Sequence, residues 1–190
     1  MDKREEEIIK SAMEVFAEVG FHKAKISHIA DRAGIAVGTI YLYFKKKEDI
    51  LEAILMRSWS IVEEALKLVI NDTDLKGTEK IKELISIIVN QAKQNRLMAQ
   101  IILHEFKYWS DNDNPRLKPL ITSIQTLLRR IISEGMENEF RSDIDPGAVT
   151  SFFIGGVWHY LAYYSNNLET INEYTVKRAL EKLVLQGMLK

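Results

Sequence analysis

Apolar residues recur every three or four positions along almost all of this 190-residue chain, which is the spacing of one face of an α-helix. Glycine and proline, which interrupt helices, number only nine and three. The sequence therefore predicts an all-α protein of about nine helices. The expected helices cover residues 3–19, 26–33, 38–44, 47–70, 77–95, 97–110, 115–138, 146–166 and 171–188.

Residues suited to helix caps lie at several of these boundaries. Gly20 and Gly34 follow the last apolar turns of the first two helices, where a left-handed conformation is common. Ser27 is a candidate N-cap of the second helix. Asp145 is a candidate N-cap of the eighth helix, because Pro146 suits the first helical position.

Residues 26–51 carry the pattern of two helices that cross at a steep angle. Such a crossing needs a small residue where the helices meet, a residue that accepts positive φ in the turn, and an apolar anchor on the second helix. Ala30, Gly34 and Ile40 supply these in order, at spacings of four and six. This pattern is typical of a DNA-binding helix-turn-helix. A plain helical corner within a bundle is the alternative interpretation.

The helix expected at residues 38–44 has an outward face that is small, apolar and hydroxyl-bearing. At about 100° per residue, Gly38 and Leu42 point away from the anchor Ile40, with Thr39 and Tyr41 beside them. Such a face suits the major groove of DNA. There a threonine hydroxyl can bond a base or a phosphate, and larger side chains can pack on thymine methyl groups.

Positive charge is concentrated in the same part of the chain. The net charge is −1 at pH 7, yet residues 22–47 carry six Lys or Arg against Asp31 alone, a net charge of +5. Residues 91–130 form a second positive segment, with seven Lys or Arg against three acidic residues. A local positive segment in a near-neutral chain suits contact with phosphate. Tyr43 and Lys47, at the edge of the outward face, are placed to meet phosphates.

Composition and motifs exclude several other classes. The chain has no cysteine and its four histidines are not spaced as a metal site, so no metal or cofactor is expected. Glycine-rich phosphate loops and serine or zinc catalytic motifs are absent, so we expect no enzyme. The charged start and the short apolar stretch at residues 84–89 predict a cytoplasmic protein with no membrane partner. A helical adaptor that binds only proteins is the alternative from another class.

Residues 5–51 resemble the DNA-binding domain of the tetracycline-repressor (TetR) family. The resemblance rests on a helix ending in VGF and on IADRAGIAVGTIYLYFKKKEDIL, with its GTIYLYF and KEDIL elements. It implies a helix-turn-helix domain at residues 1–47 and a helical ligand-binding and dimerisation domain at residues 48–190. The residues that it places on bases and phosphates, together with Leu42 from the face above, are Ser27, His28, Val37, Gly38, Thr39, Tyr41, Leu42, Tyr43 and Lys47. The chain departs from the family at Lys25 and Lys46, where hydroxyl or amide side chains are common.

The C-terminal part contains aromatic clusters at residues 106–109 and 152–164. Aromatic residues at helical spacing usually form ordinary core, but the resemblance implies that some line an elongated apolar cavity. The candidate ligand-binding residues are Trp59, Ile88, Ile102, Phe106, Lys107, Trp109 and Phe153.

Three stretches resemble the branch of the family that represses fatty-acid degradation genes and is released by long-chain acyl-coenzyme A. They are GTIYLYFKKKEDIL, LHEFKYWSDNDNPRLKPL and EGMENEFRSDIDPGAVTSFFIGG. Lys107, Arg116 or Lys118 would then meet the coenzyme phosphates. A multidrug-type or other apolar inducer is the alternative.

The last two expected helices resemble the pair that joins two subunits in this family. Gly155 and Gly156 would weaken an isolated helix by about 1 kcal/mol each, and they could allow another helix to approach closely. That helix would belong either to a second copy or to the same subunit. The candidate interface residues are Gly155, Gly156, Ala179, Leu180, Leu183 and Val184. The resemblance thus implies a homodimeric, ligand-responsive regulator of palindromic operator DNA, and a repressor rather than an activator.

Overall fold

The computed structural model describes residues 2–94, 97, 99–101, 114–165 and 173–189. These residues form eight α-helices, which confirms the all-α prediction. The ninth expected helix, residues 97–110, lies for most of its length outside the described residues. The helices are α1 (Lys3–Val19), α2 (Ile26–Ala33), α3 (Val37–Tyr43), α4 (Lys47–Asn71), α5 (Gly77–Gln94), α7 (Leu117–Asn138), α8 (Pro146–Ser165) and α9 (Glu173–Met188).

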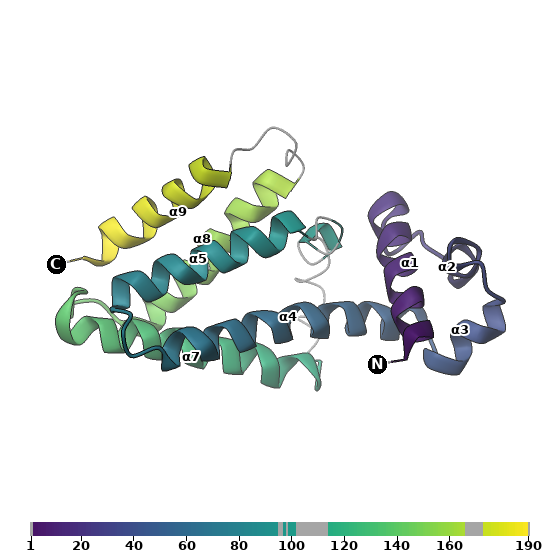
Figure 1. Ribbon diagram of the computed structural model, residues 1–190, viewed down its shortest axis with the longest axis horizontal. Helices are drawn as coiled ribbons and strands as arrows, with labels where there is room; N and C mark the ends of the chain where they lie inside the picture. The colour runs from purple at the N-terminus through teal and green to yellow at the C-terminus, as the bar shows by residue number, and fades with distance from the viewer. Residues whose placement is uncertain (1, 95–96, 98, 102–113, 166–172, 190) are drawn as a thin grey trace.

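The molecule has two parts, joined by the long helix α4 (Figure 1). Helices α1, α2 and α3 lie at one end and are called the head below. Helices α5, α7, α8 and α9, together with the rest of α4, are called the body. In the body, α4 packs against α7 and α5, α8 packs on α7, and α9 packs on α5. Within the described residues, no helix combines the length and the hydropathy needed to cross a bilayer.

Several helices begin or end one or two residues away from the expected positions, and two of these shifts have a clear local reason. Helix α3 ends one residue early because Phe44 is extended, with φ −132° and ψ 122°, which lets its ring enter the core. Helix α7 begins at Leu117 because the Asn114 side chain accepts the backbone N–H groups of Arg116 and Leu117, at 2.9 and 3.0 Å. That amide holds the chain in a turn before the helix starts.

The caps partly match expectation. Gly34 is left-handed, with φ 65° and ψ 36°, and Asp145 accepts the N–H of Ala148 at 2.7 Å, so both predictions are confirmed. Gly20 has a positive φ of 81°, but its ψ of 149° is extended rather than left-handed. The N-cap prediction for Ser27 is wrong, because α2 already begins at Ile26 and Ser27 lies inside its first turn.

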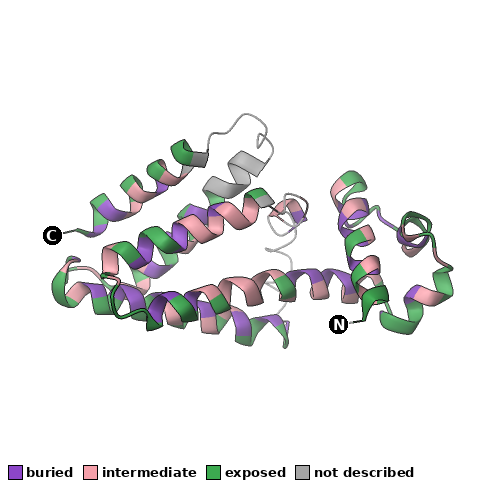
Figure 2. Ribbon diagram, in the orientation of Figure 1, coloured by how far each residue is buried: buried purple, intermediate pink, exposed green. Residues whose placement is uncertain are grey.

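The apolar core of the head continues into α4 and the body (Figure 2). Side chains of α1, α2 and α3 surround the first turns of α4, where Ile50, Leu51 and Ile54 are fully buried. Ile101 and Leu117, which come much later in the chain, belong to the same buried cluster. The head therefore shares its core with residues of the body. A second cluster fills the body between α4, α5, α7, α8 and α9.

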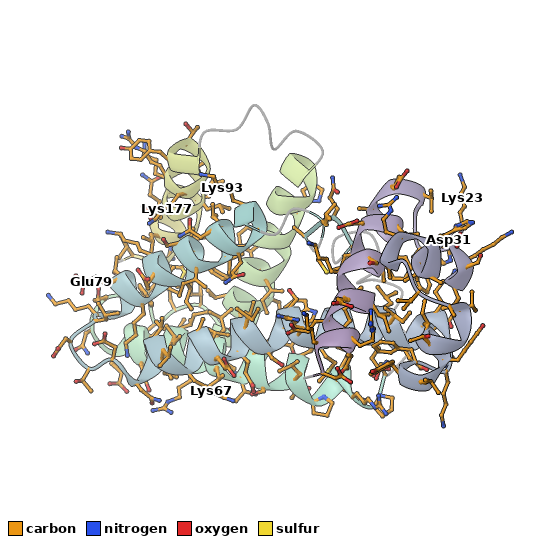
Figure 3. The ribbon with its side chains drawn as sticks, turned by 45° about the vertical axis from the view of Figure 1, so that its right-hand side comes forward. Lys23, Asp31, Lys67, Glu79, Lys93 and Lys177 are labelled. Carbon is orange, nitrogen blue, oxygen red and sulfur yellow. The ribbon has the colours of Figure 1, made fainter. Side chains whose placement is uncertain are left out.

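Polar contacts tie the body helices to one another. On α4, Glu52 accepts from Asn114 at 3.0 Å and from Arg116 at 2.8 Å. Lys177 of α9 donates to Ser86 of α5 at 2.8 Å; it is labelled in Figure 3. Such bonds fix the rotation of each helix against its neighbour.

The start of α5 is held by the end of α7. Glu139 accepts from the N–H of Gly77 at 2.7 Å and from the hydroxyl of Thr78 at 2.6 Å. Phe140 is fully buried beside Gly135, where a Cβ would lie 2.2 Å from the ring, so the glycine is required for this close approach. Burial raises the pKa of Glu139, but the bonds from Thr78 and Gly77 outweigh it and hold the pKa below its ordinary value.

We expect Glu139→Gln to lower the unfolding free energy at pH 7 by about 1 kcal/mol, the usual cost of losing a helix cap. Because the folded-state pKa is lowered, this stabilisation is present above the ordinary pKa of a glutamate and is lost as the pH falls through the folded-state value. The difference between the two proteins should therefore vanish in acid. Urea unfolding between pH 7 and pH 3 measures it, and Glu137→Gln, at an exposed position on α7, is the control. An equal difference at both pH values would contradict the charge-based cap.

Candidate nucleic-acid interface

Helix α3 has one buried side and one exposed side. Ile40 is fully buried and Phe44 nearly so, and both pack into the core of the head. On the opposite side Leu42 is 82% exposed and Tyr41 is 51% exposed. Val37, Gly38 and Thr39 complete this surface; Val37 and Gly38 are exposed and Thr39 is half-buried. Val37, Tyr41 and Leu42 are exposed together on one short helix, and a group of exposed apolar side chains of this kind is typical of a surface that meets another molecule.

Gly38 has no internal reason to be glycine. Among the described residues, a Cβ built on it would meet nothing within 4 Å, and its φ is not positive. The free protein would therefore accept a larger side chain at this position. Glycine is useful there only if the backbone of α3 approaches something outside the subunit.

The turn before α3 and the packing of α2 set the direction of this face. After the left-handed Gly34, the N–H of Ile35 donates to Ala30 O at 3.0 Å. Ala30 is buried where α2 meets its neighbours, as its small size predicts. Arg32 joins α2 to α1 by donating to Glu18 at 2.5 Å and to Glu14 at 3.2 Å, and these two bonds raise the pKa of Arg32.

Exposed basic residues lie on the turns before α2 and after α3. Lys23 and Lys25 are exposed on the turn between α1 and α2, and Lys45 and Lys46 are exposed on the turn between α3 and α4. Figure 3 shows Lys23 on the side of the head away from the body. Ser27 and His28 are exposed in the first turn of α2. Helix α4 itself is capped by Asp49, whose carboxylate accepts the N–H groups of Lys45 and Lys46 at 3.0 and 3.1 Å.

Tyr43, expected at a phosphate, donates its hydroxyl to Asp2 at 2.8 Å. The other oxygen of Asp2 accepts the N–H of Arg4 at 3.0 Å and so caps α1. The hydrogen bond from the N–H of Arg4, and after it the bond from the Tyr43 hydroxyl, lowers the pKa of Asp2. The same bond to the Asp2 carboxylate raises the pKa of Tyr43. This contact fixes the end of α3 to the start of α1. A phosphate would have to replace Asp2 as the acceptor.

Lys47, also expected at a phosphate, turns its ammonium toward the protein. It donates to the carbonyl oxygens of Phe21, His22 and Ala24, at 2.6, 3.3 and 2.9 Å. It also lies 4.4 Å from the centre of the Phe21 ring. The sequence did not indicate these contacts, because backbone acceptors leave no trace in residue type.

The ligand candidates are only partly described. Phe153 is buried in the core of the body, Ile88 is half-buried against that core, and Trp59 packs against both apolar clusters. Ile102, Phe106, Lys107 and Trp109 lie outside the described residues. Of the proposed coenzyme contacts, Arg116 donates to Glu52 and Lys118 is exposed on α7.

The interface candidates divide into two groups. Leu183 is 68% exposed, and Gly155 and Gly156 are exposed with nothing described within 4 Å of a Cβ at either position. This arrangement does not favour a same-subunit contact at the two glycines. Leu180, by contrast, is 3% exposed and belongs to the core of its own subunit, while Ala179 and Val184 are half-buried.

Sequence reasoning missed Phe152 as an interface candidate. It is 75% exposed and lies three and four residues before Gly155 and Gly156, on the same side of α8. The spacing could have placed it with the glycines, but only Phe153 of this aromatic run was proposed for a role, as a candidate ligand-binding residue.

These observations define the class of protein. A short helix with an exposed apolar face follows a left-handed turn, exposed basic residues lie on the turns before α2 and after α3, and the head continues into a helical body. This is a helix-turn-helix DNA-binding head on an α-helical body.

Family comparisons agree with this class. The model "Bacterial regulatory proteins, tetR family" matches residues 8–54, and the model "Tetracyclin repressor-like, C-terminal domain" matches residues 74–166. The chain belongs to the TetR family and is a transcriptional regulator with a DNA-binding helix-turn-helix, as its sequence predicted. Both models describe regulators rather than enzymes.

Among curated relatives, the fatty acid metabolism regulator protein of Bacillus subtilis is 24% identical over 187 residues, covering 96% of this chain and 94% of the relative. The solved structure of the fatty acid degradation regulator FadR from Bacillus halodurans has a TM-score of 0.87 at 24% identity, covering 98% and 97% of the two chains. FadR from Bacillus subtilis, in complex with stearoyl-CoA, has a TM-score of 0.82 at 25% identity, covering 96% and 98%. These proteins share the fold of this chain over nearly its whole length.

Proposed function

We propose that this protein is a repressor that binds palindromic operator DNA as a homodimer and is released by a long-chain acyl-coenzyme A. The observation that carries the proposal is the outward side of α3, where Leu42 and Tyr41 are exposed around a glycine with open space above it. In this proposal residues 1–47 bind DNA, and residues 48–190 bind the ligand and the second subunit.

Base reading is assigned to the outward side of α3. Tyr41 and Leu42 would pack on thymine methyl groups, and Thr39 would bond a base or a phosphate. Phosphates would be met by Ser27 and His28 and by the exposed lysines of the two flanking turns. The residues assigned to bases are Val37, Gly38, Thr39, Tyr41 and Leu42.

A homodimer is supported by the outer sides of α8 and α9. Phe152 and Leu183 are large apolar side chains that the subunit leaves exposed, and Gly155 and Gly156 present bare backbone beside them. A second copy would cover the apolar side chains, and the glycines would allow its helix to approach closely. Two heads joined in this way can enter successive major grooves when they lie about 34–36 Å apart.

The acyl-coenzyme A assignment is supported by relatedness over nearly the full chain. The solved structure of FadR from Bacillus subtilis is a complex with stearoyl-CoA. That protein is 25% identical to this chain, and the match covers 96% of this chain. Trp59, Ile88 and Phe153 supply apolar surface inside the body, which suits an acyl chain. The ligand would act by preferring a dimer whose heads are too far apart for the operator.

The test begins with a duplex selected by the purified protein from a randomised library. Operator affinity is then measured by fluorescence anisotropy with stearoyl-CoA, coenzyme A or stearate added. We expect stearoyl-CoA to raise the operator Kd by about 5–150-fold, the usual range of allosteric coupling, and coenzyme A to have no effect.

Two results would count against the proposal. If no duplex is enriched, the DNA-binding half fails. If calorimetry detects no binding of stearoyl-CoA, the acyl-coenzyme A half fails, and a multidrug-type or other apolar inducer takes its place.

A further inference from the structure

Lys47, the first residue of α4, holds the turn that joins α1 to α2. This turn, residues 20–25, presents three carbonyl oxygens to the ammonium, from Phe21 at 2.6 Å, Ala24 at 2.9 Å and His22 at 3.3 Å. The Phe21 ring adds a cation–π contact, at 4.4 Å from Nζ to the ring centre.

These contacts use the full donor capacity of the side chain. An ammonium has three protons and accepts no hydrogen bond, and three carbonyl oxygens lie around it. Phe21 and Ala24 are both buried, at 4% exposure each, so their backbone oxygens need partners inside the protein. A phosphate could bind Lys47 only by displacing one of these carbonyls.

The same turn leads directly to side chains that face outward. Lys23 and Lys25 are exposed on it, and Ser27 and His28 follow in the first turn of α2. The position of the turn therefore sets where these four side chains lie relative to the exposed side of α3. Because Lys47 begins α4, it also joins the turn to the helix that runs on into the body.

We propose that Lys47 is a positioning residue for operator binding: it holds the 20–25 turn so that Lys23, Lys25, Ser27 and His28 meet the DNA backbone, and it does not contact a phosphate itself. The inference rests on the proposed function. A displacement of α4 on ligand binding would carry the turn with it, since the two are tied at this residue.

Salt dependence separates the two roles. A lysine that contacts a phosphate releases counterions. Removing it from both subunits of the proposed homodimer reduces the magnitude of the slope of log K against log salt by about 1.8, which is about 0.9 per phosphate contact. A lysine that only positions others changes the affinity with a much smaller change in slope. The experiment compares Lys47→Met with Lys23→Met, Lys25→Met and Lys46→Met on the duplex selected by the wild-type protein, over a range of KCl concentrations.

A second variant retains the charge. Lys47→Arg keeps a cation that could serve a phosphate, but a planar guanidinium cannot direct its protons at three carbonyls around one point. Hydrogen exchange of the amides in the 20–25 turn of the free protein is measured for both Lys47 variants. The exchange measurement needs no DNA. If Lys47→Met folds poorly, the exchange of Lys47→Arg still tests the inference.

We expect Lys47→Met to weaken operator binding about tenfold, with a slope change less than half of the largest seen among the three control lysines. Lys47→Arg should weaken binding at least threefold, and both variants should show faster exchange in the turn but not in the middle of α1. The inference is overturned if Lys47→Met reduces the magnitude of the slope by about 1.8, the loss expected for two phosphate contacts per dimer, while Lys47→Arg binds like wild type. It is also overturned if the turn exchanges normally. Failure of the wild-type protein to select DNA would instead remove the proposed function, and the exchange result would still stand.

Discussion

Gly38→Leu should abolish operator recognition while leaving the protein folded. The Cβ of the new side chain meets open space among the described residues of the free subunit, and leucine is a better helix former than glycine. On DNA the same side chain would lie between the backbone of α3 and the major groove. We expect operator affinity to fall at least about a hundredfold, toward non-specific binding, which is weaker than specific binding by about 10³–10⁷-fold.

Fluorescence anisotropy measures this loss, and the thermal unfolding midpoint shows that the fold is kept. Gly38→Ala is the graded control, because its single methyl group should cost less affinity. Wild-type operator affinity in Gly38→Leu would show that the outward side of α3 does not approach DNA closely.

The second large effect is expected on the outer side of α8. Phe152→Glu places a carboxylate where the proposed second subunit would cover an apolar surface, and burying an unpaired charge is costly. Because Phe152 is 75% exposed, the subunit itself loses little packing. We expect a monomer, and operator affinity at least about a hundredfold weaker, since one head alone makes only half of the contacts.

Sedimentation equilibrium gives the mass, and anisotropy gives the affinity. The matched control is Leu68→Glu, because Leu68 is also a 75% exposed apolar residue but lies on α4. It should leave both mass and affinity unchanged. A Phe152→Glu dimer with normal operator affinity would place the subunit contact elsewhere.

Helix positions and the outward side of α3 could be predicted from the sequence because both depend on local spacing. Ile40 and Leu42 lie on opposite sides of one short helix, and rotation about its axis alone predicts which is buried. The N-cap of α2 is Lys25 rather than the predicted Ser27. Local propensity does not locate a helix end to within two residues. Leu180, predicted at the subunit interface, is buried in the core of its own subunit. An amphipathic stripe shows that one side of a helix is covered, but it does not show whether the same subunit or a second copy covers it.

The parts of the site that escaped prediction depend on contacts between distant residues. Asp2 and Tyr43 are 41 positions apart, and Lys47 reaches backbone oxygens 23 to 26 positions earlier. Neither pairing follows from periodicity or charge pattern. Both pairings depend on the packing of α1 against α4, which brings the start and the end of the head together.

The shared core bears on attempts to build hybrid regulators. Ile101 and Leu117 complete the hydrophobic cluster beneath α1 and α2, and the first turns of α4 fill its centre. A graft that moves residues 1–47 onto an unrelated sensor would expose this cluster and remove six of its eighteen buried members. Successful transplants should carry the early turns of α4 together with matching substitutes for Ile101 and Leu117, so the practical unit of exchange is discontinuous in sequence.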